Sequence, residues 1–289
     1  MNLRSLFQPD RLTPEWVHTA DGLLWRLFCA RSGRLIGECR DQERKTATFF
    51  CLDERTGVPL WKNLRLEESW WVGIEAVIGD VLILHTYAKP DMPQHRGIHA
   101  FDVATGSPRW RNDDCTFWFS VRDRAYAYRD LFEKRVGYEF DVFSGAVLRT
   151  FEESLDELGA LKAESSGNQD LEGVVLPEPF DRESSGAGLQ QLFDRALRGA
   201  VPTGSVDFAT SKDIVAFSYY LPARRGRGEK PAFENHLQVY RSPDGVRLFS
   251  EVINENLAFP VPDTFFIRGP RLLFLKNQQS LISLRLWQS

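Results

Sequence analysis

The segments FFCLDERTGVPLW at 49–61 and IHAFDVATGSPRW at 98–110 share one pattern. Each has an apolar strand, an Asp, a Thr–Gly pair and a second strand with Trp four residues after the Gly. Weaker copies are YEFDVFSGAVL at 138–148 and QVYRSPDGVRLF at 238–249. Gly supplies the positive φ of a tight turn, and the Asp side chain accepts hydrogen bonds from the turn amides. Each copy is therefore predicted to be a β-hairpin.

The hairpins recur at intervals that indicate a repeated sheet. Their glycines fall at positions 57, 106, 145 and 245, so the spacings are 49, 39 and 100 residues. Strand-like runs before each hairpin supply two inner strands. A period near 50 in an all-β chain is typical of a β-propeller built from four-stranded antiparallel blades. Trp61, Trp110 and Phe249 share one offset after the Gly, so we expect them to pack between neighbouring blades.

Five blades are legible. Complete units cover 23–63, 70–112, 115–151 and 205–251, and the tail from Pro262 supplies only three strands. We expect the N-terminal segment 14–20 to add the missing strand and close the ring, because closure removes two sheet edges. The prediction is a single β-propeller domain over 1–289.

Residues 152–204 do not follow the repeat. The segment is acidic and rich in Ser and Gly, and its apolar residues at 188–199 follow a helical i, i+3, i+4 pattern that ends at Gly199. We interpret it as a loop-plus-helix insertion, with a decayed sixth blade as the alternative.

Composition limits the partners of the chain. Its 289 residues carry a net charge of −4, which does not favour nucleic acid as a partner. The sequence shows neither an apolar signal region nor an apolar run of membrane-spanning length, so we expect a cytoplasmic protein without a membrane partner. Cys29, Cys39, Cys51 and Cys115 lack metal-binding or redox spacing, so we expect buried, reduced thiols.

The LDERTGVPLW and FDVATGSPRW segments resemble the repeat of the PQQ-like, or quinoprotein-type, β-propeller superfamily. Within it, the chain looks like a member of an uncharacterised bacterial group of small propeller-like proteins. The resemblance implies the fold. Quinone-dependent members bring a calcium site and adjacent cysteines, and this sequence has no adjacent cysteine pair. We therefore expect no quinone and no other cofactor.

One end of the predicted propeller is basic. Five loops at 41–45, 89–96, 129–135, 222–234 and 276–279 have a net charge of +5, and the insertion has −7. The rim residues are Arg224, Arg225, Arg227 and Lys230. We expect the acidic insertion to regulate access to this rim, with ordinary solvated loops as the alternative.

Candidate binding residues fall at the same end. They are Arg26, Glu38, Arg40, Trp70, Trp71, His85, Tyr87, His95, Tyr219 and Tyr220. Side chains alternate along a strand, so one of Trp70 and Trp71 should face outward and stack on a sugar, base or peptide. Packing between blades is the alternative. The neighbouring histidines 85, 95 and 99 lack a firm carboxylate or thiolate partner in the sequence, so no metal site is predicted.

These observations favour a non-enzymatic binding or scaffold module. Its partner would be another protein or a small anionic ligand at the channel mouth. The alternative is a hydrolase or lyase that acts on a saccharide, with Glu38, Arg40, His85 and Tyr87 as its polar groups. That chemistry needs two carboxylates about 5–10 Å apart.

Overall fold

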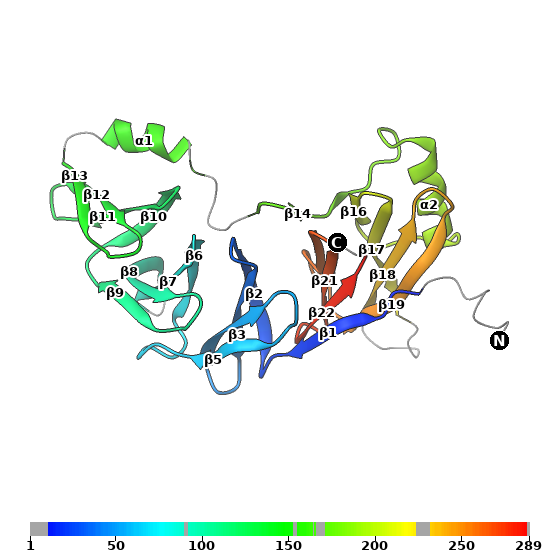
Figure 1. Ribbon diagram of the computed structural model, residues 1–289, viewed down its shortest axis with the longest axis horizontal. Helices are drawn as coiled ribbons and strands as arrows, with labels where there is room; N and C mark the ends of the chain where they lie inside the picture. The colour runs from blue at the N-terminus through cyan, green and yellow to red at the C-terminus, as the bar shows by residue number, and fades with distance from the viewer. Residues whose placement is uncertain are drawn as a thin grey trace. The chain divides into compact units, whose positions relative to one another are not determined.

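The structure is a computed structural model that describes residues 11–89, 92–152, 155–163, 165, 171–223 and 232–287. The described part is mostly β and forms five antiparallel sheets (Figure 1). The chain divides into two compact units: the N-terminal unit, Ala20–Glu172, and the C-terminal unit, which combines Met1–Thr19 with Gly173–Ser289.

The N-terminal unit contains three sheets, each made of four strands that follow one another in the chain. The first sheet is β2 (Leu23–Ala30), β3 (Arg34–Asp41), β4 (Thr46–Asp53) and β5 (Pro59–Leu64). The second is β6 (Val72–Ile78), β7 (Val81–Lys89), β8 (Met92–Asp102) and β9 (Pro108–Asn112). The third is β10 (Thr116–Val121), β11 (Arg124–Asp130), β12 (Arg135–Asp141) and β13 (Val147–Phe151). The three units predicted over 23–151 are confirmed as sheets.

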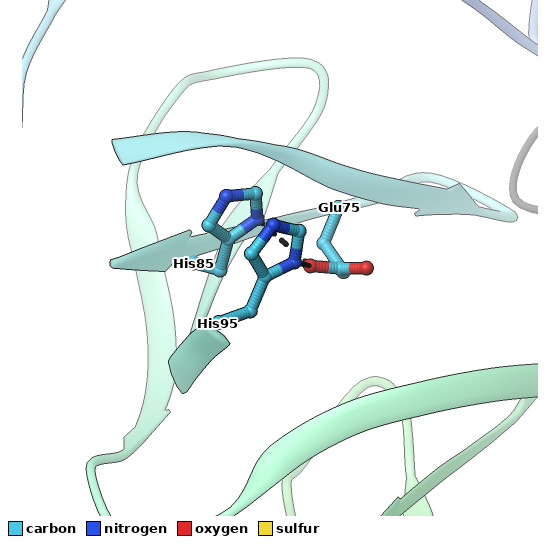
Figure 2. Close-up of side chains that lie close together, drawn as sticks. All are labelled: Glu75, His85 and His95. Carbon is cyan, nitrogen blue, oxygen red and sulfur yellow. Dashed lines mark hydrogen bonds and ion pairs between the residues drawn. The ribbon is translucent and has the colours of Figure 1, made fainter. Parts of the chain in front are cut away.

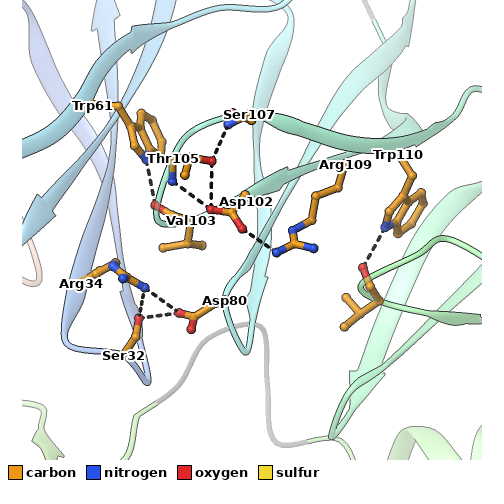
Figure 3. A network of polar contacts seen from close by, with 11 residues as sticks. Ser32, Arg34, Trp61, Asp80, Asp102, Val103, Thr105, Ser107, Arg109 and Trp110 are labelled. Carbon is orange, nitrogen blue, oxygen red and sulfur yellow. Dashed lines mark hydrogen bonds and ion pairs between the residues drawn. The ribbon is translucent and has the colours of Figure 1, made fainter.

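The Thr–Gly turns have the geometry that the sequence predicts. Gly57 and Gly106 have φ values of 68° and 70°. Asp102 Oδ1 accepts hydrogen bonds from the Thr105 amide at 2.9 Å and the Thr105 hydroxyl at 3.0 Å (Figure 3). Each turn is thus stabilised by its own Asp side chain.

The two repeat tryptophans join neighbouring sheets. Trp61 Nε1 donates to the Val103 carbonyl at 2.8 Å, and Trp110 Nε1 donates to the Val142 carbonyl at 2.7 Å (Figure 3). The Trp110 ring lies so close to Gly145 that a Cβ there would approach it to 2.5 Å. Each Trp therefore covers the turn of the next sheet, which confirms the predicted packing of Trp61 and Trp110.

Apolar layers between the sheets form the core of the N-terminal unit. Ile36 and Phe49 of the first sheet pack with Ile74 and Leu84 of the second, and all four are fully buried. The second and third sheets enclose a similar layer. Strands buried on both faces agree with the near-continuous apolar runs in the sequence.

The C-terminal unit contains two sheets with five strands each. One is β15 (Glu178–Pro179), β16 (Asp207–Ser211), β17 (Ile214–Pro222), β18 (Phe233–Arg241) and β19 (Val246–Leu257). The other has the order β1 (Pro14–Thr19), β22 (Ser280–Arg285), β21 (Arg271–Lys276), β20 (Phe265–Arg268) and β14 (Val174–Val175). β1 pairs antiparallel with β22, with Val17 opposite Ile282. The N-terminal segment therefore supplies a strand to the last sheet, as predicted.

Two helices lie in the segment that breaks the repeat. The predicted helix is present as α2 (Ala187–Leu197), whereas α1 (Leu155–Ala163) was not predicted. Leu158 of α1 is fully buried against the third sheet, beside Phe119 and Phe151. Leu192 of α2 is buried against the β15–β19 sheet. Each helix covers a face of the sheet in its own unit.

All four cysteines are free and buried in the structure, which agrees with the expectation of packed thiols. Burial raises the pKa of Cys39 and Cys51 to about 12 and that of Cys115 to about 11. The thiols of Cys39, Cys51 and Cys115 are therefore protonated and unreactive at neutral pH. Among the described residues, no helix is long and apolar enough to cross a membrane.

Candidate functional site

An aromatic pocket of about 180 Å³ lies in the N-terminal unit. Its lining residues are Trp25, Arg40, Gln42, Trp70, Trp71 and Tyr87. Trp25 is 56% exposed and Trp71 is 37% exposed, so the rings of both reach solvent. Four of the six residues were predicted from the sequence, and the structure brings those four together. We call this the aromatic pocket.

The two adjacent tryptophans reach the pocket from a turn. Glu68 Oε1 accepts hydrogen bonds from the Trp70 and Trp71 amides at 2.9 and 3.1 Å, and β6 begins only at Val72. The Trp71 carbonyl accepts the Tyr87 amide at 3.0 Å. The expectation that residues 70–71 belong to a regular strand is therefore wrong, because Glu68 bends the chain before the strand starts. Both rings border the pocket instead of pointing to opposite faces.

An ion pair lies beneath the pocket. Arg40 Nε donates to Glu38 Oε1 at 2.7 Å, and Arg40 Nη1 donates to the Trp70 carbonyl at 2.5 Å. Glu38 is fully buried, and its other oxygen accepts the Ile74 amide at 2.9 Å. The guanidinium also donates to the Val72 carbonyl. The charge of Arg40 is thus neutralised by Glu38, and its donors hold the Trp70 turn in place.

Arg26 belongs to the same connection between the first two sheets. It lies opposite Glu38 in the pairing of β2 with β3. Its Nη1 donates to the Ile74 carbonyl at 2.8 Å. Three of the candidate binding residues, Arg26, Glu38 and Arg40, therefore lie together, and their side chains attach the first sheet to β6.

A second group of side chains lies beside the aromatic pocket. Glu75 Oε2 is 2.7 Å from His95 Nδ1 and 2.8 Å from His85 Nδ1 (Figure 2). The two imidazole rings stack with centroids 3.6 Å apart. The Tyr87 ring meets them edge-on, at 5.4 Å from His85 and 5.2 Å from His95. Tyr87 therefore contacts both the aromatic pocket and this group, which we call the His–Glu cluster.

A β-bulge accompanies the position of Glu75. In the pairing of β6 with β7, Ile74 lies opposite Leu84 and Ala76 opposite Ile83, so Glu75 is the unpaired residue. A bulge redirects the side chain of its extra residue. A second irregularity in the pairing of β7 with β8 lies at Gly97, whose φ is 78°. The same pairing shifts again between Tyr87 and Lys89, so three departures from regular pairing lie around the His–Glu cluster.

Burial and charge determine the protonation of the cluster. Burial alone would raise the pKa of Glu75, but the close contacts with the His85 and His95 rings and the charges of these rings outweigh it and lower the pKa to about 2. Burial lowers the pKa of His85, the Glu75 carboxylate opposes this shift, and the charges of His95 and Arg26 add to it. At neutral pH the group therefore holds an anionic Glu75 and a neutral His85.

A larger groove of about 530 Å³ lies over the outer part of the second sheet. Its lining residues are Arg65, Leu66, Glu67, Glu68, Thr86, His99, Ala100, Phe101, Pro108, Arg109, Trp110 and Arg111. Arg109 forms an ion pair with Asp102 and Arg111 forms one with Asp113, each with a nitrogen–oxygen distance of 2.5 Å. His99 lines this groove and is not a member of the His–Glu cluster.

The remaining predicted residues lie elsewhere. Tyr219 and Tyr220 belong to the C-terminal unit and are buried. The Tyr219 hydroxyl donates to the Ala196 carbonyl at 3.1 Å, and the Tyr220 hydroxyl donates to the Val261 carbonyl. Both hydroxyls are thus used within that unit. The predicted rim residues at 224, 225, 227 and 230 lie outside the described residues.

Sequence reasoning missed Trp25, Gln42 and Glu75. The sequence contains a usable signal for Trp25 and Glu75, because the first strands of the three sheets in the N-terminal unit carry a bulge at the same place. The extra residue is Trp25 in β2, Glu75 in β6 and Trp118 in β10. Aligning these strands would have shown one carboxylate at a position that holds Trp in the other two sheets.

Comparisons with known proteins give one family match and several similar structures. Residues 30–110 match a domain of unknown function (DUF4905). A search of curated proteins found no match. Among solved structures, the chain is similar to the Dos1 propeller, with a TM-score of 0.31 and 10% identity over 92% of this chain and 68% of that one.

Two further structures are β-propeller domains. That of Cps50 (Swd1) from Myceliophteria thermophila has a TM-score of 0.37 and 9% identity, over 96% of this chain and 100% of that one. That of the trilobed protease from Pyrococcus furiosus has a TM-score of 0.31 and 10% identity, over 89% of this chain and 78% of that one.

Proposed function

We propose that the chain is a single β-propeller domain that acts as a binding module, with the aromatic pocket as the place where it holds a protein partner. The ring closure and the cytoplasmic location predicted from the sequence are part of this proposal. The free, buried thiols support the location. The observation that carries the binding role is the partly exposed pocket formed by Trp25, Trp71 and Tyr87.

The size of the aromatic pocket favours a protein partner over a small molecule. Pockets that enclose a whole small ligand usually measure about 300–1,000 Å³. At about 180 Å³, the aromatic pocket has room for one side chain of a larger partner. Protein interfaces often depend on a single anchor residue that fills such a pocket.

The chemistry of the pocket favours an uncharged anchor. Arg40 is the only charged residue among the six that line the pocket, and its charge is neutralised by Glu38, so these six residues offer the predicted small anionic ligand no unpaired cation. Trp and Tyr rings bind proline and apolar side chains, and the Gln42 amide offers a hydrogen bond to a peptide backbone. We therefore propose an extended peptide segment with a proline or aromatic anchor as the partner.

The enzyme hypothesis has less support. A saccharide hydrolase needs a carboxyl group that is free to exchange a proton with substrate. Both oxygens of Glu38 are occupied, by Arg40 and by the Ile74 amide, and the side chain is fully buried. Glu38 therefore serves the structure in this arrangement. Stacking of a sugar on Trp25 or Trp71 stays an outcome of the test below.

The test uses a phage-displayed library of proline- and aromatic-containing peptides, followed by fluorescence titration of one selected peptide. We expect Trp25→Ala and Trp71→Ala each to weaken its binding at least tenfold, a loss of about 1.4 kcal/mol. Trp118→Ala is the matched control, because Trp118 occupies the bulge of the third sheet that Trp25 occupies in the first. The control should bind normally.

Selection of no peptide that depends on Trp25 and Trp71 would contradict the proposed function. Binding of a saccharide from a glycan array, lost in the same two variants, would replace it with the sugar hypothesis. Circular dichroism spectra of all variants establish that each is folded before its affinity is compared.

A further inference from the structure

The His–Glu cluster contains buried nitrogen atoms that lack a good partner. His85 is 1% exposed, and within the described residues neither of its ring nitrogens makes a hydrogen bond of acceptable geometry. Its Nδ1 lies 2.8 Å from Glu75 Oε2, but the direction is unfavourable for a hydrogen bond. An unsatisfied buried polar group costs free energy, so a native protein seldom keeps one without a use for it.

The same atoms have the composition of a metal site. One ligand atom each from Glu75, His85 and His95 lie within 4.8 Å of one another. Two imidazole nitrogens and one carboxylate oxygen are a common zinc ligand set, which leaves a fourth position open. We propose that Glu75, His85 and His95 form a binding site for a divalent transition-metal ion of the zinc class. This site goes beyond the proposed peptide binding and does not depend on it.

A hydrogen-bonded cluster without metal is the competing explanation. In that case one carboxylate oxygen would serve both imidazoles, as Figure 2 shows, and the buried Nδ1 of His85 would keep only its poorly directed contact with Glu75. A metal ion at the Nδ1 atoms would use the electron pairs that point toward Glu75. The observed stacking of the two rings beside one carboxylate is then the metal-free arrangement of the site.

Metal binding requires a small and specific movement. Zinc bond lengths of about 2.0–2.2 Å place neighbouring tetrahedral ligand atoms about 3.3 Å apart. The present separations are 2.7 and 2.8 Å, so the ligands must move apart by about 0.5 Å. Parallel rings also cannot aim two nitrogens at one ion, so the stack must open. The His95 side chain is 30% exposed and is the ligand with room to turn.

The surroundings hold the other two ligands. Glu75 is the bulge residue of β6, and His85 lies in the middle of β7 opposite Gly73. A Cβ at residue 73 would lie 3.2 Å from the His85 ring, so the glycine leaves space for this imidazole. Tyr87 covers the edges of both rings. Two ligands are therefore preorganised and the third closes the site.

The experiment measures zinc binding to the full-length, chelator-treated chain by competition with a chromophoric zinc indicator. We expect one zinc ion per chain, and at least tenfold weaker binding in Glu75→Gln and His95→Ala. The matched control is His99→Gln, a histidine on the same strand that lies outside the cluster. The His99→Gln variant should bind zinc normally. It also tests whether His99 joins His85 and His95 as a ligand, since the three histidines are neighbours in the sequence.

A direct readout of ligation keeps the test independent of variant stability. Cobalt(II) bound to His95→Cys should give a near-ultraviolet thiolate charge-transfer band that the wild-type complex lacks. Absence of stoichiometric zinc binding to the wild type would overturn the proposal. So would unchanged affinity in both ligand variants, an equal loss in His99→Gln, or cobalt bound to His95→Cys without the thiolate band. Peptide binding in the same variants reports separately on the aromatic pocket.

Discussion

Positions with positive φ require glycine for two different reasons in this protein. Gly33 has a φ of 74° and open space where a Cβ would project. Gly145 has nearly the same φ, 71°, but a Cβ there would lie 2.5 Å from the Trp110 ring. The first position requires glycine for backbone conformation alone. The second also requires it so that the tryptophan of the preceding sheet can lie on the turn.

The two glycines therefore predict unequal losses of stability. Gly33→Ala should lower the free energy of unfolding by about 1–2 kcal/mol, the cost of a left-handed conformation. Gly145→Ala should lower it by about 2–4 kcal/mol, because steric overlap with Trp110 adds to that cost. Urea unfolding of both variants measures the difference. Equal losses would mean that the Trp110 ring moves away freely.

Replacement of the tryptophan on the other side of the Gly145 contact should also lower the stability. Trp110→Ala should cost about 2–4 kcal/mol, somewhat less than a fully buried Trp, because the half-buried ring loses its contact with Gly145 and its hydrogen bond to Val142. Trp25→Ala should change stability by less than about 0.5 kcal/mol, since Trp25 is 56% exposed. Thermal melts of both variants test this, and an unchanged melting temperature for Trp110→Ala would contradict the packing.

His85 predicts the direction of the pH dependence of stability. Its pKa in the folded protein is below the unfolded value of 6.5, mainly because of burial. The unfolded chain therefore binds more protons as the pH falls through 6.5, and the free energy of unfolding decreases. Glu75, His95 and Arg26 are the charged or titratable groups that act on it. Glu75, with a folded pKa of about 2, adds a further loss only below its unfolded value of 4.5.

The measurement compares the wild type with His85→Gln by urea unfolding between about pH 8 and pH 5. The wild type should lose more stability than the variant over this range. His99 and His236 also have pKa values lowered mainly by burial, and both residues are present in both proteins, so most of their contribution cancels in the comparison. Identical pH dependence in the two proteins would show that His85 titrates normally in the folded state.

At the scale of elements, helix α2 covers a hairpin turn in the C-terminal unit, whereas strands of the preceding sheets cover the corresponding turns in the N-terminal unit. The turn at Gly245 is covered by Arg195 of α2, which also donates to the Gly245 carbonyl, whereas the turns at Gly106 and Gly145 are covered by Trp side chains. Trp61 and Trp110 come from the preceding sheets. The helix thus supplies within the C-terminal unit the contact that a neighbouring sheet would provide.

This packing predicts that α2 stabilises the sheet it covers. Leu192→Ala should lower the free energy of unfolding by about 2–4 kcal/mol, because Leu192 is 4% exposed and packs in the core of that sheet. Leu176→Ala is the matched control, since Leu176 is 55% exposed in the same segment. Chemical denaturation distinguishes them, and equal effects would mean that α2 is not anchored.

The segment 152–204 is consequently an integral part of two sheets, in addition to being a loop-plus-helix insertion in the repeat. It provides β14 to one sheet, β15 to another, and Phe180, whose ring stacks on Phe193 of α2 at 4.0 Å. Removing residues 160–186 would delete these three elements of packing. We therefore expect such a deletion to destabilise the C-terminal unit. A test of whether the acidic segment regulates access to the basic rim would instead use point substitutions of its exposed acidic residues.

At the scale of the whole molecule, the single-domain proposal predicts a compact particle. A folded domain of 289 residues has an expected radius of gyration of about 19 Å. Small-angle X-ray scattering at several protein concentrations measures this value for the monomer. A radius above about 23 Å would contradict a single closed domain and would show two units that are separated in solution.

The sequence by itself determined the elements of the three sheets in the N-terminal unit, the Thr–Gly turns and the role of Trp61 and Trp110. These features are local, since a strand pattern, an Asp and a Gly within a few residues specify a hairpin. The pairing of residues 14–20 with the last sheet was also predictable, because a sheet of three strands leaves an edge that another strand can cover.

Only the tertiary structure decided the candidate sites. Glu75 meets His85 and His95 in a sheet with irregular pairing at Glu75 and Gly97. An alignment of the first strands marks Glu75 as unusual, but it does not show which side chains Glu75 meets. Trp25 meets Trp71 because two sheets pack against each other. Side chains 46 residues apart become neighbours through packing energy that is spread over the whole interface between sheets, and no short segment of sequence contains that information.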